Sequence, residues 1–198
     1  MPTAAKTFQA FRQYLSQFGH LTDAEFEHIC QLAKFQKVRK GVHFLKEDTI
    51  CRQIGFILSG VMRTGSYAGD REMTCYFMKE NQFTGGFESM MSGRISDYFV
   101  QALTPCELMV FSKDNFEKML REVPKVQAWS AAILTHELSD KVNQRASLNN
   151  MLEAKDIYER FEKEHPDILL RVPLTYVASY LGITPQSFSR LRRERQKP

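Results

Sequence analysis

Hydrophobic residues near the start of the chain recur every three or four positions, which is the spacing of one face of an α-helix. The pattern predicts a helix through Phe8, Phe11, Tyr14, Leu15 and Phe18. A second helix is predicted after Thr22, because a threonine side chain can cap the free N–H groups of a first helical turn and acidic residues follow it. The apolar residues of that second helix are Phe26, Ile29, Cys30 and Leu32.

The middle of the chain has a different rhythm. From about Val38 to Phe111 the apolar segments are short, rich in β-branched and aromatic residues, and separated by glycine or aspartate. Strands of this length at roughly ten-residue spacing predict a small antiparallel barrel or jelly roll. Its clearest turns are Ser59–Gly60 and residues 68–70. The predicted strands are Ile54–Leu58, Val61–Tyr67, Met73–Met78, Tyr98–Ala102 and Glu107–Phe111.

Helical spacing returns after Ser112, which together with Asp114 is a candidate cap for a helix. Pro124 fits the first turn of a much longer helix that reaches about Asn149, roughly 37 Å at 1.5 Å per residue. A helix of that length either crosses a large domain or pairs with a copy of itself. The stripe that we expect to form a dimer interface is Val126, Trp129, Ile133, Leu134, Leu138 and Val142. A further helix is predicted over Met151 to Glu164.

The segment Leu174–Arg195 has the spacing of a helix-turn-helix. Ala178 would lie where two crossing helices come closest, and Gly182, four residues later, suits a turn position with positive φ. Thr184 and Pro185 open the second helix as its cap and first-turn residue. Phe188 would then pack back against the first helix.

The other face of this second helix is polar and basic, and its residues fit the chemistry of DNA. The major groove admits one helix, in which glutamine can pair with adenine and arginine with guanine, so Gln186 and Arg190 are the candidates for reading bases. Serine and arginine also reach phosphates. The alternative is a plain two-helix hairpin with a basic end. The full set of candidate DNA-binding residues is Thr184, Gln186, Ser187, Ser189, Arg190, Arg192, Arg193 and Arg195.

Charge strengthens the DNA interpretation. The net charge of +4 over 198 residues is unremarkable, but residues 171–198 hold six basic residues and one acidic residue, a net +5. The other 170 residues hold 21 basic and 22 acidic residues, a net −1. Such asymmetry favours an anionic partner for the C-terminal segment, nucleic acid or a membrane surface. A solvated basic helix end is the simpler alternative.

Composition, together with the spacing of the cysteines and histidines, excludes several other classes of protein. With 43% hydrophobic and 25% charged residues, the chain is neither disordered nor fibrous. No apolar run is long enough for a membrane span and no signal-peptide core occurs, so we expect a cytoplasmic protein without membrane partners. The four cysteines form no CxxC pair and the five histidines no HxxxH, so no metal site is predicted. Only His43 lies in the β region, which disfavours a metal-dependent barrel enzyme, and no catalytic residue is predicted.

With these residues in view, the chain resembles the family of the cyclic-AMP receptor protein and the fumarate–nitrate regulator. The likeness runs from about Phe26 to Arg195 and rests on Lys40–Gly41, Gly55–Arg63, Ala102–Leu108, Ala178–Thr184 and Ser189–Arg190. It implies an α+β fold with a β-roll sensor of the cyclic-nucleotide-binding type over 1–122, a dimerisation helix over 123–150 and a helix-turn-helix over 151–198. It also implies a homodimer that regulates transcription by reading a palindrome in double-stranded DNA, with RNA polymerase as a further partner.

The expected effector pocket departs from the family pattern. Members that bind cyclic AMP hold its ribose with a Gly-Glu pair and its phosphate with an Arg-Ser or Arg-Ala pair, as a buried phosphodiester requires. Here Gly86 stands at the glutamate position, Ser96–Asp97 at the second pair, and Lys141–Val142 at an adenine-contacting Thr-Ser pair. We therefore predict that the effector is not cyclic AMP. The candidate pocket residues for an unidentified small effector are Gly85, Gly86, Phe87, Glu88, Ser89, Arg94, Ser96 and Asp97.

Two alternatives stay open beside the regulator. One is the disfavoured barrel or cupin enzyme, and the second is a ligand-binding or protein-interaction module whose basic tail serves solubility, without specific DNA readout. The other sensors of the family also fit poorly, because no cysteine cluster precedes Cys30 and a lone histidine such as His43 is a weak haem candidate. Leu169–Val172 is the only short run that could form a wing strand before the helix-turn-helix.

Overall fold

The computed structural model describes residues 4–69, 71–149 and 154–195 of the chain. Helix α1 (Ala4–Ser16) and helix α2 (Asp23–Leu32) confirm the two predicted N-terminal helices. The Thr22 hydroxyl accepts the backbone N–H of Glu25, and the Glu25 carboxylate accepts the backbone N–H of Thr22, which completes a capping box at the start of α2. The apolar face of α1 buries Phe11, Tyr14 and Leu15 against the β-sheets.

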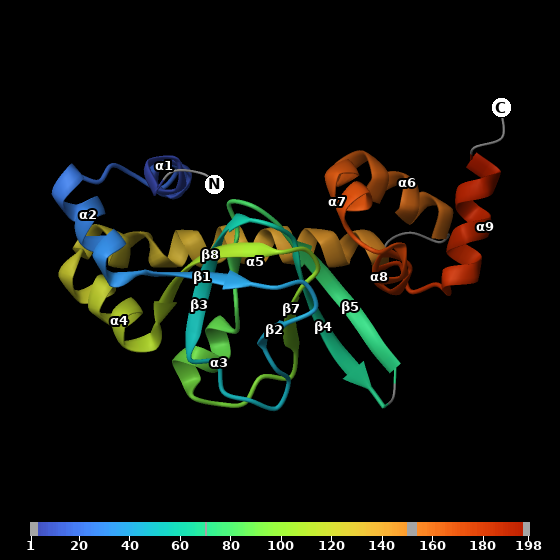
Figure 1. The fold of residues 1–198 in the computed structure, drawn as a ribbon, viewed down its shortest axis with the longest axis horizontal. Coiled ribbons are helices and arrows are strands. Elements are labelled where there is room, and N and C mark those ends of the chain that lie inside the picture. Colours follow the sequence, from blue (N-terminus) through green and yellow to red (C-terminus); the bar gives the residue numbers. More distant parts are fainter. Residues whose placement is uncertain (1–3, 70, 150–153, 196–198) are drawn as a thin grey trace.

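The middle of the chain forms a roll of two four-stranded antiparallel sheets (Figure 1). One sheet has the order β1-β8-β3-β6 and the other β2-β7-β4-β5. All five predicted strands are present, and β1, β2 and β6 are additional. The strands are β1 (Lys34–Val38), β2 (His43–Leu45), β3 (Gln53–Ser59), β4 (Met62–Ala68), β5 (Arg71–Met78), β6 (Phe83–Thr84), β7 (Phe99–Ala102) and β8 (Cys106–Ser112).

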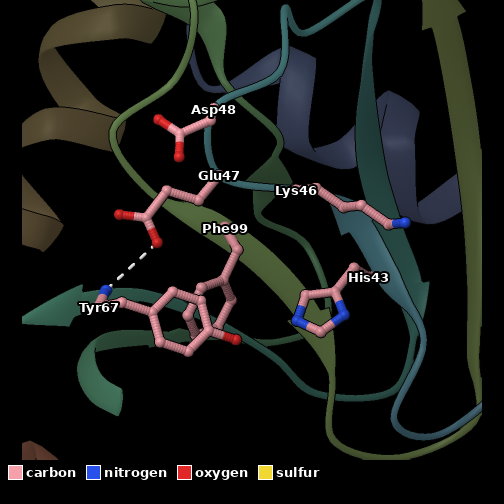
Figure 2. Close-up of a pocket in the computed structure, with 6 residues that line it drawn as sticks. All are labelled: His43, Lys46, Glu47, Asp48, Tyr67 and Phe99. Carbon is pink, nitrogen blue, oxygen red and sulfur yellow. Dashed lines mark hydrogen bonds between the residues drawn. The ribbon is translucent and has the colours of Figure 1, made fainter. Parts of the chain in front are cut away.

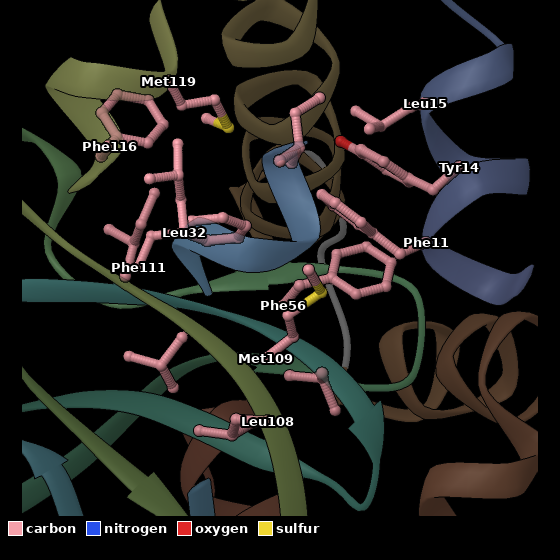
Figure 3. Packing of buried hydrophobic residues seen from close by; sticks show 14 of the residues in the cluster. Phe11, Tyr14, Leu15, Leu32, Phe56, Leu108, Met109, Phe111, Phe116 and Met119 are labelled. Atoms are coloured by element: carbon pink, nitrogen blue, oxygen red, sulfur yellow. The ribbon is translucent and has the colours of Figure 1, made fainter. Parts of the chain in front are cut away.

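Alternation along the strands places the core between the two sheets. Ile57 of β3, Met62 of β4 and Leu108 of β8 are fully buried there, whereas Phe56, on the opposite face of β3, is buried against Phe11 and Tyr14 of α1. Phe11 from α1 and Phe116 from α4 extend this core outward (Figure 3). The predicted turn at Gly60 is confirmed with φ +104°, a conformation that favours glycine.

Helices follow the roll. Helix α3 (Phe87–Ser92) lies within it, and α4 (Lys113–Glu122) begins at the predicted cap Ser112, whose hydroxyl accepts the backbone N–H of Asn115. Helix α5 (Pro124–Asn149) matches the predicted long helix and runs from α4 toward the C-terminal helices (Figure 1). No helix among the described residues is long and apolar enough to cross a membrane.

Four helices complete the chain: α6 (Ala154–Glu164), α7 (Pro166–Arg171), α8 (Leu174–Tyr180) and α9 (Pro185–Arg195). The candidate wing strand Leu169–Val172 is wrong, because Leu169–Arg171 belongs to α7. Pro166 explains the difference, since its fixed φ suits the first turn of a helix. These helices share a second core, which also takes in Val61, Phe77 and Leu103 from the roll.

Candidate nucleic-acid interface

The C-terminal helices pack as the helix-turn-helix spacing predicts. Val177 and Ala178 of α8 are fully buried, so a side chain larger than alanine at position 178 would separate the crossing helices. Phe188 of α9 is also buried, and its ring meets the edge of Tyr158 in α6 with centroids 5.1 Å apart. The apolar side of α9 therefore faces a core formed by α6 and α8.

The turn between α8 and α9 depends on one glycine. Gly182 has φ +69°, and a Cβ added there would meet no atom within 4 Å. Position 182 therefore favours glycine because of its positive φ angle, and not because a side chain would clash there. The backbone N–H of Ile183 donates to the Ala178 carbonyl at 3.0 Å, which closes the turn against α8.

Helix α9 presents its polar face to solvent. Thr184 caps it as predicted, since its Oγ1 accepts the backbone N–H of Ser187 at 3.1 Å. Arg192 is half-buried beside Tyr158, whereas the side chain of Arg195 lies outside the described residues. α9 is the outermost helix at its end of the molecule (Figure 1). The exposed residues on it include Gln186, Ser187, Ser189, Arg190 and Arg193.

The candidate helix-turn-helix, α8 and α9, is docked on strand β5 of the roll through α8. The backbone N–H of Thr74 donates to Ser179 Oγ at 3.0 Å. Further along the strand, the Phe77 ring meets Tyr180 of α8 and Phe161 of α6, with centroids 5.4 and 5.8 Å apart. Burial raises the pKa of Tyr180 to about 12. This contact links the candidate DNA-reading unit directly to the roll.

The contact between the C-terminal helices and β5 is called the docking surface below, and two ion pairs border it. Lys79 Nζ lies 2.9 Å from both carboxylate oxygens of Asp167, and Arg171 makes a two-pronged pair with Glu80 at 2.6 and 2.9 Å. Glu80 also accepts the backbone N–H of Gly60 at 2.7 Å. Burial alone would raise the pKa of Glu80, but the bonds from Arg171 and from backbone N–H groups outweigh it and lower that pKa.

Arg63 of β4 forms the buried centre of the docking surface. Its side chain is 1% exposed and donates to Gln101 and Thr74 at 2.7–3.0 Å, and it is paired with Glu72. The guanidinium lies 3.9 Å from the ring centroid of Tyr176 in α8. Sequence reasoning missed this residue, because an arginine within a strand gives no local sign that another domain covers it.

The expected effector pocket is filled by the protein's own groups. A Cβ at Gly86 would approach Leu45 Cδ2 to 2.8 Å and Cys51 Cβ to 3.1 Å, which leaves no space for a glutamate side chain. The Gly86 N–H donates to Cys51 Sγ. Ser89 accepts the backbone N–H of Cys51 and donates to the Arg94 carbonyl at 2.6 Å.

The second half of that expected pocket offers no free anion-binding group either. Ser96 is buried, and its hydroxyl donates to the Tyr98 carbonyl at 2.8 Å. Arg94 is 75% exposed and pairs with Glu88, while Asp97 is also exposed. Gly85, Phe87 and Ser89 thus lie near the buried site, whereas Arg94 turns out to solvent and no arginine stands where a phosphodiester would need one.

The predicted dimer stripe is divided between the interior and the surface. Val126 is buried, and Trp129 and Ile133 pack against the core of the roll, with the Trp129 ring next to Gly19. Leu134 is half-buried and Leu138 is 56% exposed. The side chain of Val142, and that of Lys141, lie outside the described residues.

A known protein family matches the part of the chain that forms the roll. Residues 35–123 match the cyclic nucleotide-binding domain family. The match covers β1 to α4, the part of the chain that contains both sheets. A search of curated proteins finds no match for this chain.

Solved structures share the wider fold at low identity. A putative transcriptional regulator of the Crp/Fnr family from Eubacterium rectale is 18% identical with a TM-score of 0.69, over 93% of this chain and 88% of that one. The c-di-GMP responsive global regulator CLP of Xanthomonas campestris is 14% identical with a TM-score of 0.68, over 88% of this chain and 92% of that one. FixK2 from Bradyrhizobium japonicum is 17% identical with a TM-score of 0.66, over 82% and 83% of the two chains. The arrangement of roll, long helix and C-terminal helices is therefore that of this group of structures.

Proposed function

We propose that the protein is a DNA-binding transcription regulator of the Crp/Fnr type and not an enzyme. The observation that carries the proposal is the exposed face of α9, on which Gln186, Ser189, Arg190 and Arg193 lie in solvent above a fully packed apolar side. A glutamine and an arginine at that spacing on a helix suit base edges in the major groove, and the remaining residues suit phosphates.

The regulator would act as a homodimer through the middle of α5. Ala131, Leu134 and Leu138 share one helix face at three- and four-residue spacing, and Leu138 is an apolar side chain left in solvent within a 26-residue helix. Two copies paired along this face would present two α9 helices to the two half-sites of a palindrome. The buried Val126 and the partly buried Trp129 and Ile133 would instead hold α5 to its own roll.

Cyclic AMP does not fit as the effector. The space that a ribose-binding glutamate would need is occupied by Leu45 and Cys51, and Arg94 points away from the buried site. A phosphodiester placed there would lose its water without gaining a cationic partner. The effector, where one acts, therefore has a different chemistry or a different site.

A selection from random duplex DNA tests the function. We expect enrichment of an inverted repeat, with half-sites about one helical turn apart. Arg190→Ala should cost about 1–3 kcal/mol, concentrated at one base pair in each half-site. Arg160→Ala is the matched control, because Arg160 lies on α6 in an exposed pair with Glu164. Leu138→Glu should reduce binding to that of a single half-site.

The alternative, a ligand-binding or protein-interaction module, predicts a different outcome. Such a protein would bind DNA weakly and only at low salt, and no motif would be enriched. A uniform loss over all sequences in Arg190→Ala would make Arg190 a phosphate contact. Recovery of no inverted repeat would contradict the regulator proposal.

A further inference from the structure

A cavity of about 470 Å³ lies on the outer face of the sheet β2-β7-β4-β5, and none of its lining residues belongs to the expected effector pocket. Met62 and Val100 belong to the core between the sheets, so their neighbours Arg63 and Phe99 face outward. The volume is in the range of small-molecule sites. The lining residues are His43, Lys46, Glu47, Asp48, Tyr67 and Phe99.

One side of the cavity is an aromatic wall. Phe99 is centred between His43 and Tyr67, with ring centroids 5.2 Å from each. Gly65, which pairs with Phe99 across the two strands, makes room for this wall, since a Cβ there would approach Phe99 Cζ to 2.4 Å. Tyr67 remains about half exposed, so one face of the wall is open to a ligand.

Two carboxylates stand opposite the wall. Glu47 accepts the backbone N–H of Tyr67 at 3.2 Å. The backbone N–H of Asp48 donates to the Ser96 carbonyl at 2.9 Å, which ties this segment to the roll. Figure 2 shows the Glu47 carboxylate beside Tyr67, the Asp48 carboxylate next to Glu47, and the amine of Lys46 extended away from both. The Glu47 carboxylate is thus held beside Tyr67, with Asp48 as its neighbour, before any ligand arrives.

The charge balance of the cavity favours a cation. Burial, with Arg63 and Lys46 nearby, lowers the pKa of His43, so its imidazole is neutral near neutral pH. The lining then holds two negative groups and one positive group. A cation next to a tyrosine ring gains from the negative face of the ring as well as from a carboxylate partner, whereas a phosphate would be repelled.

We propose that this cavity binds a small organic cation, an amine or a guanidinium compound, with its charged group between Tyr67 and the carboxylates of Glu47 and Asp48. The apolar body of the ligand would lie on the exposed parts of Tyr67 and His43, in front of the buried Phe99 ring. Neither the family match nor the expected pocket over Gly85–Asp97 assigns a ligand here.

A single side chain, that of Arg63, lies between the cavity and the candidate DNA-binding unit. The guanidinium of Arg63 lies 5.1 Å from the Phe99 ring centroid and 3.9 Å from that of Tyr176 in α8. A ligand that shifts Phe99 would therefore act on the contact that holds α8. This coupling rests on the proposed function, whereas binding of the cation does not.

Calorimetric titration of the full chain tests the site, with agmatine and tyramine as probes and N-acetyltyramine as a neutral comparator. We expect the two amines to bind and the neutral comparator not to bind. The double variant Glu47→Gln with Asp48→Asn should weaken binding at least tenfold. Glu27→Gln with Asp114→Asn removes the same charge from exposed positions on α2 and α4, outside the cavity and the expected effector pocket, and should change affinity less than twofold. Thermal unfolding of each variant verifies that it is folded.

Three results would overturn the site: no heat with either amine at millimolar concentration, equal affinity for the neutral comparator, or equal losses in the two double variants. The coupling is measured separately, as the change in affinity for a selected operator with and without the bound amine. An unchanged operator affinity would overturn the coupling, and the proposed DNA-binding function would still stand on the selection experiment.

Discussion

Arg63 shows how a single residue can serve two domains. Burying an arginine side chain until it is 1% exposed costs free energy unless its charge is paired and its N–H groups have hydrogen-bond acceptors. In the roll, Glu72 pairs with the charge, and Gln101 and Thr74 accept hydrogen bonds. Tyr176 of α8 covers the guanidinium. The pKa of Arg63 is lowered by burial, but an arginine remains charged near neutral pH. Its buried charge therefore depends on both domains being in place.

At the turn of the helix-turn-helix, Gly182 allows a clean test of backbone conformation. Gly182→Ala should lower the free energy of unfolding by about 1–2 kcal/mol, because alanine is strained at φ +69° while its Cβ meets nothing. Gly182→Asn should cost less, since asparagine tolerates that region. Denaturant unfolding of the two variants measures the difference. Equal losses of unfolding free energy in the two variants would show that a factor other than the φ angle limits which residues position 182 tolerates.

Elements with a long periodic pattern were predictable, and short ones were not. The 26-residue α5 and the amphipathic α9 follow from spacing and caps that are local in the chain. Strands β2 and β6 have three and two residues, too few to show any alternation. The run Leu169–Val172 predicts a possible strand although most of it belongs to α7, because a helix of six residues is too short to show a helical period.

The link between α2 and α5 makes a prediction about pH. Glu25 belongs to the capping box and pairs with Lys125 at 2.9 Å, and the bonds from Lys125 and Thr22 lower the pKa of Glu25 to about 2. A carboxyl with a lowered pKa in the folded state stabilises the fold above its unfolded value near 4.5, and that stability is lost as the pH falls toward 2.

Lys125→Met should accordingly reduce the loss of stability between pH 5 and pH 3. Denaturant midpoints at the two pH values, compared with those of the wild-type chain, measure this change. Lys118→Met is the control, since the pair of Lys118 with Glu122 is exposed and 3.9 Å long. A pH dependence that is the same in all three proteins would contradict the assignment to Glu25.

On the scale of the whole molecule, the C-terminal helices dock on β5, and the proposed regulation would depend on this contact. The surface combines the second hydrophobic core with the pairs Lys79–Asp167 and Arg171–Glu80. Because each pair is about one-third exposed, we expect both together to contribute only about 1 kcal/mol.

Replacing Lys79 and Arg171 by methionine should therefore speed amide hydrogen exchange roughly fivefold in residues 154–195, and leave β3 and β8 unchanged. Lys37→Met with Arg94→Met is the matched control, since those exposed pairs lie within the roll. Faster exchange throughout the roll would mean general destabilisation rather than loosened docking. No acceleration in residues 154–195 would show that the apolar contact alone holds the C-terminal helices.

The sequence by itself determined the longer elements, the turn at Gly182, the cap at Thr184 and the basic character of the C-terminal segment, since each depends on residues within about ten positions of one another. It also predicts that the effector is not cyclic AMP, and the packing of Leu45 and Cys51 against Gly86 supports that prediction. Only the tertiary structure decided that Val126 is internal, that Arg63 is a buried junction and that an acidic aromatic cavity lies beside it. Those features join residues up to about a hundred positions apart, and contacts at such separation leave no periodic trace in the chain.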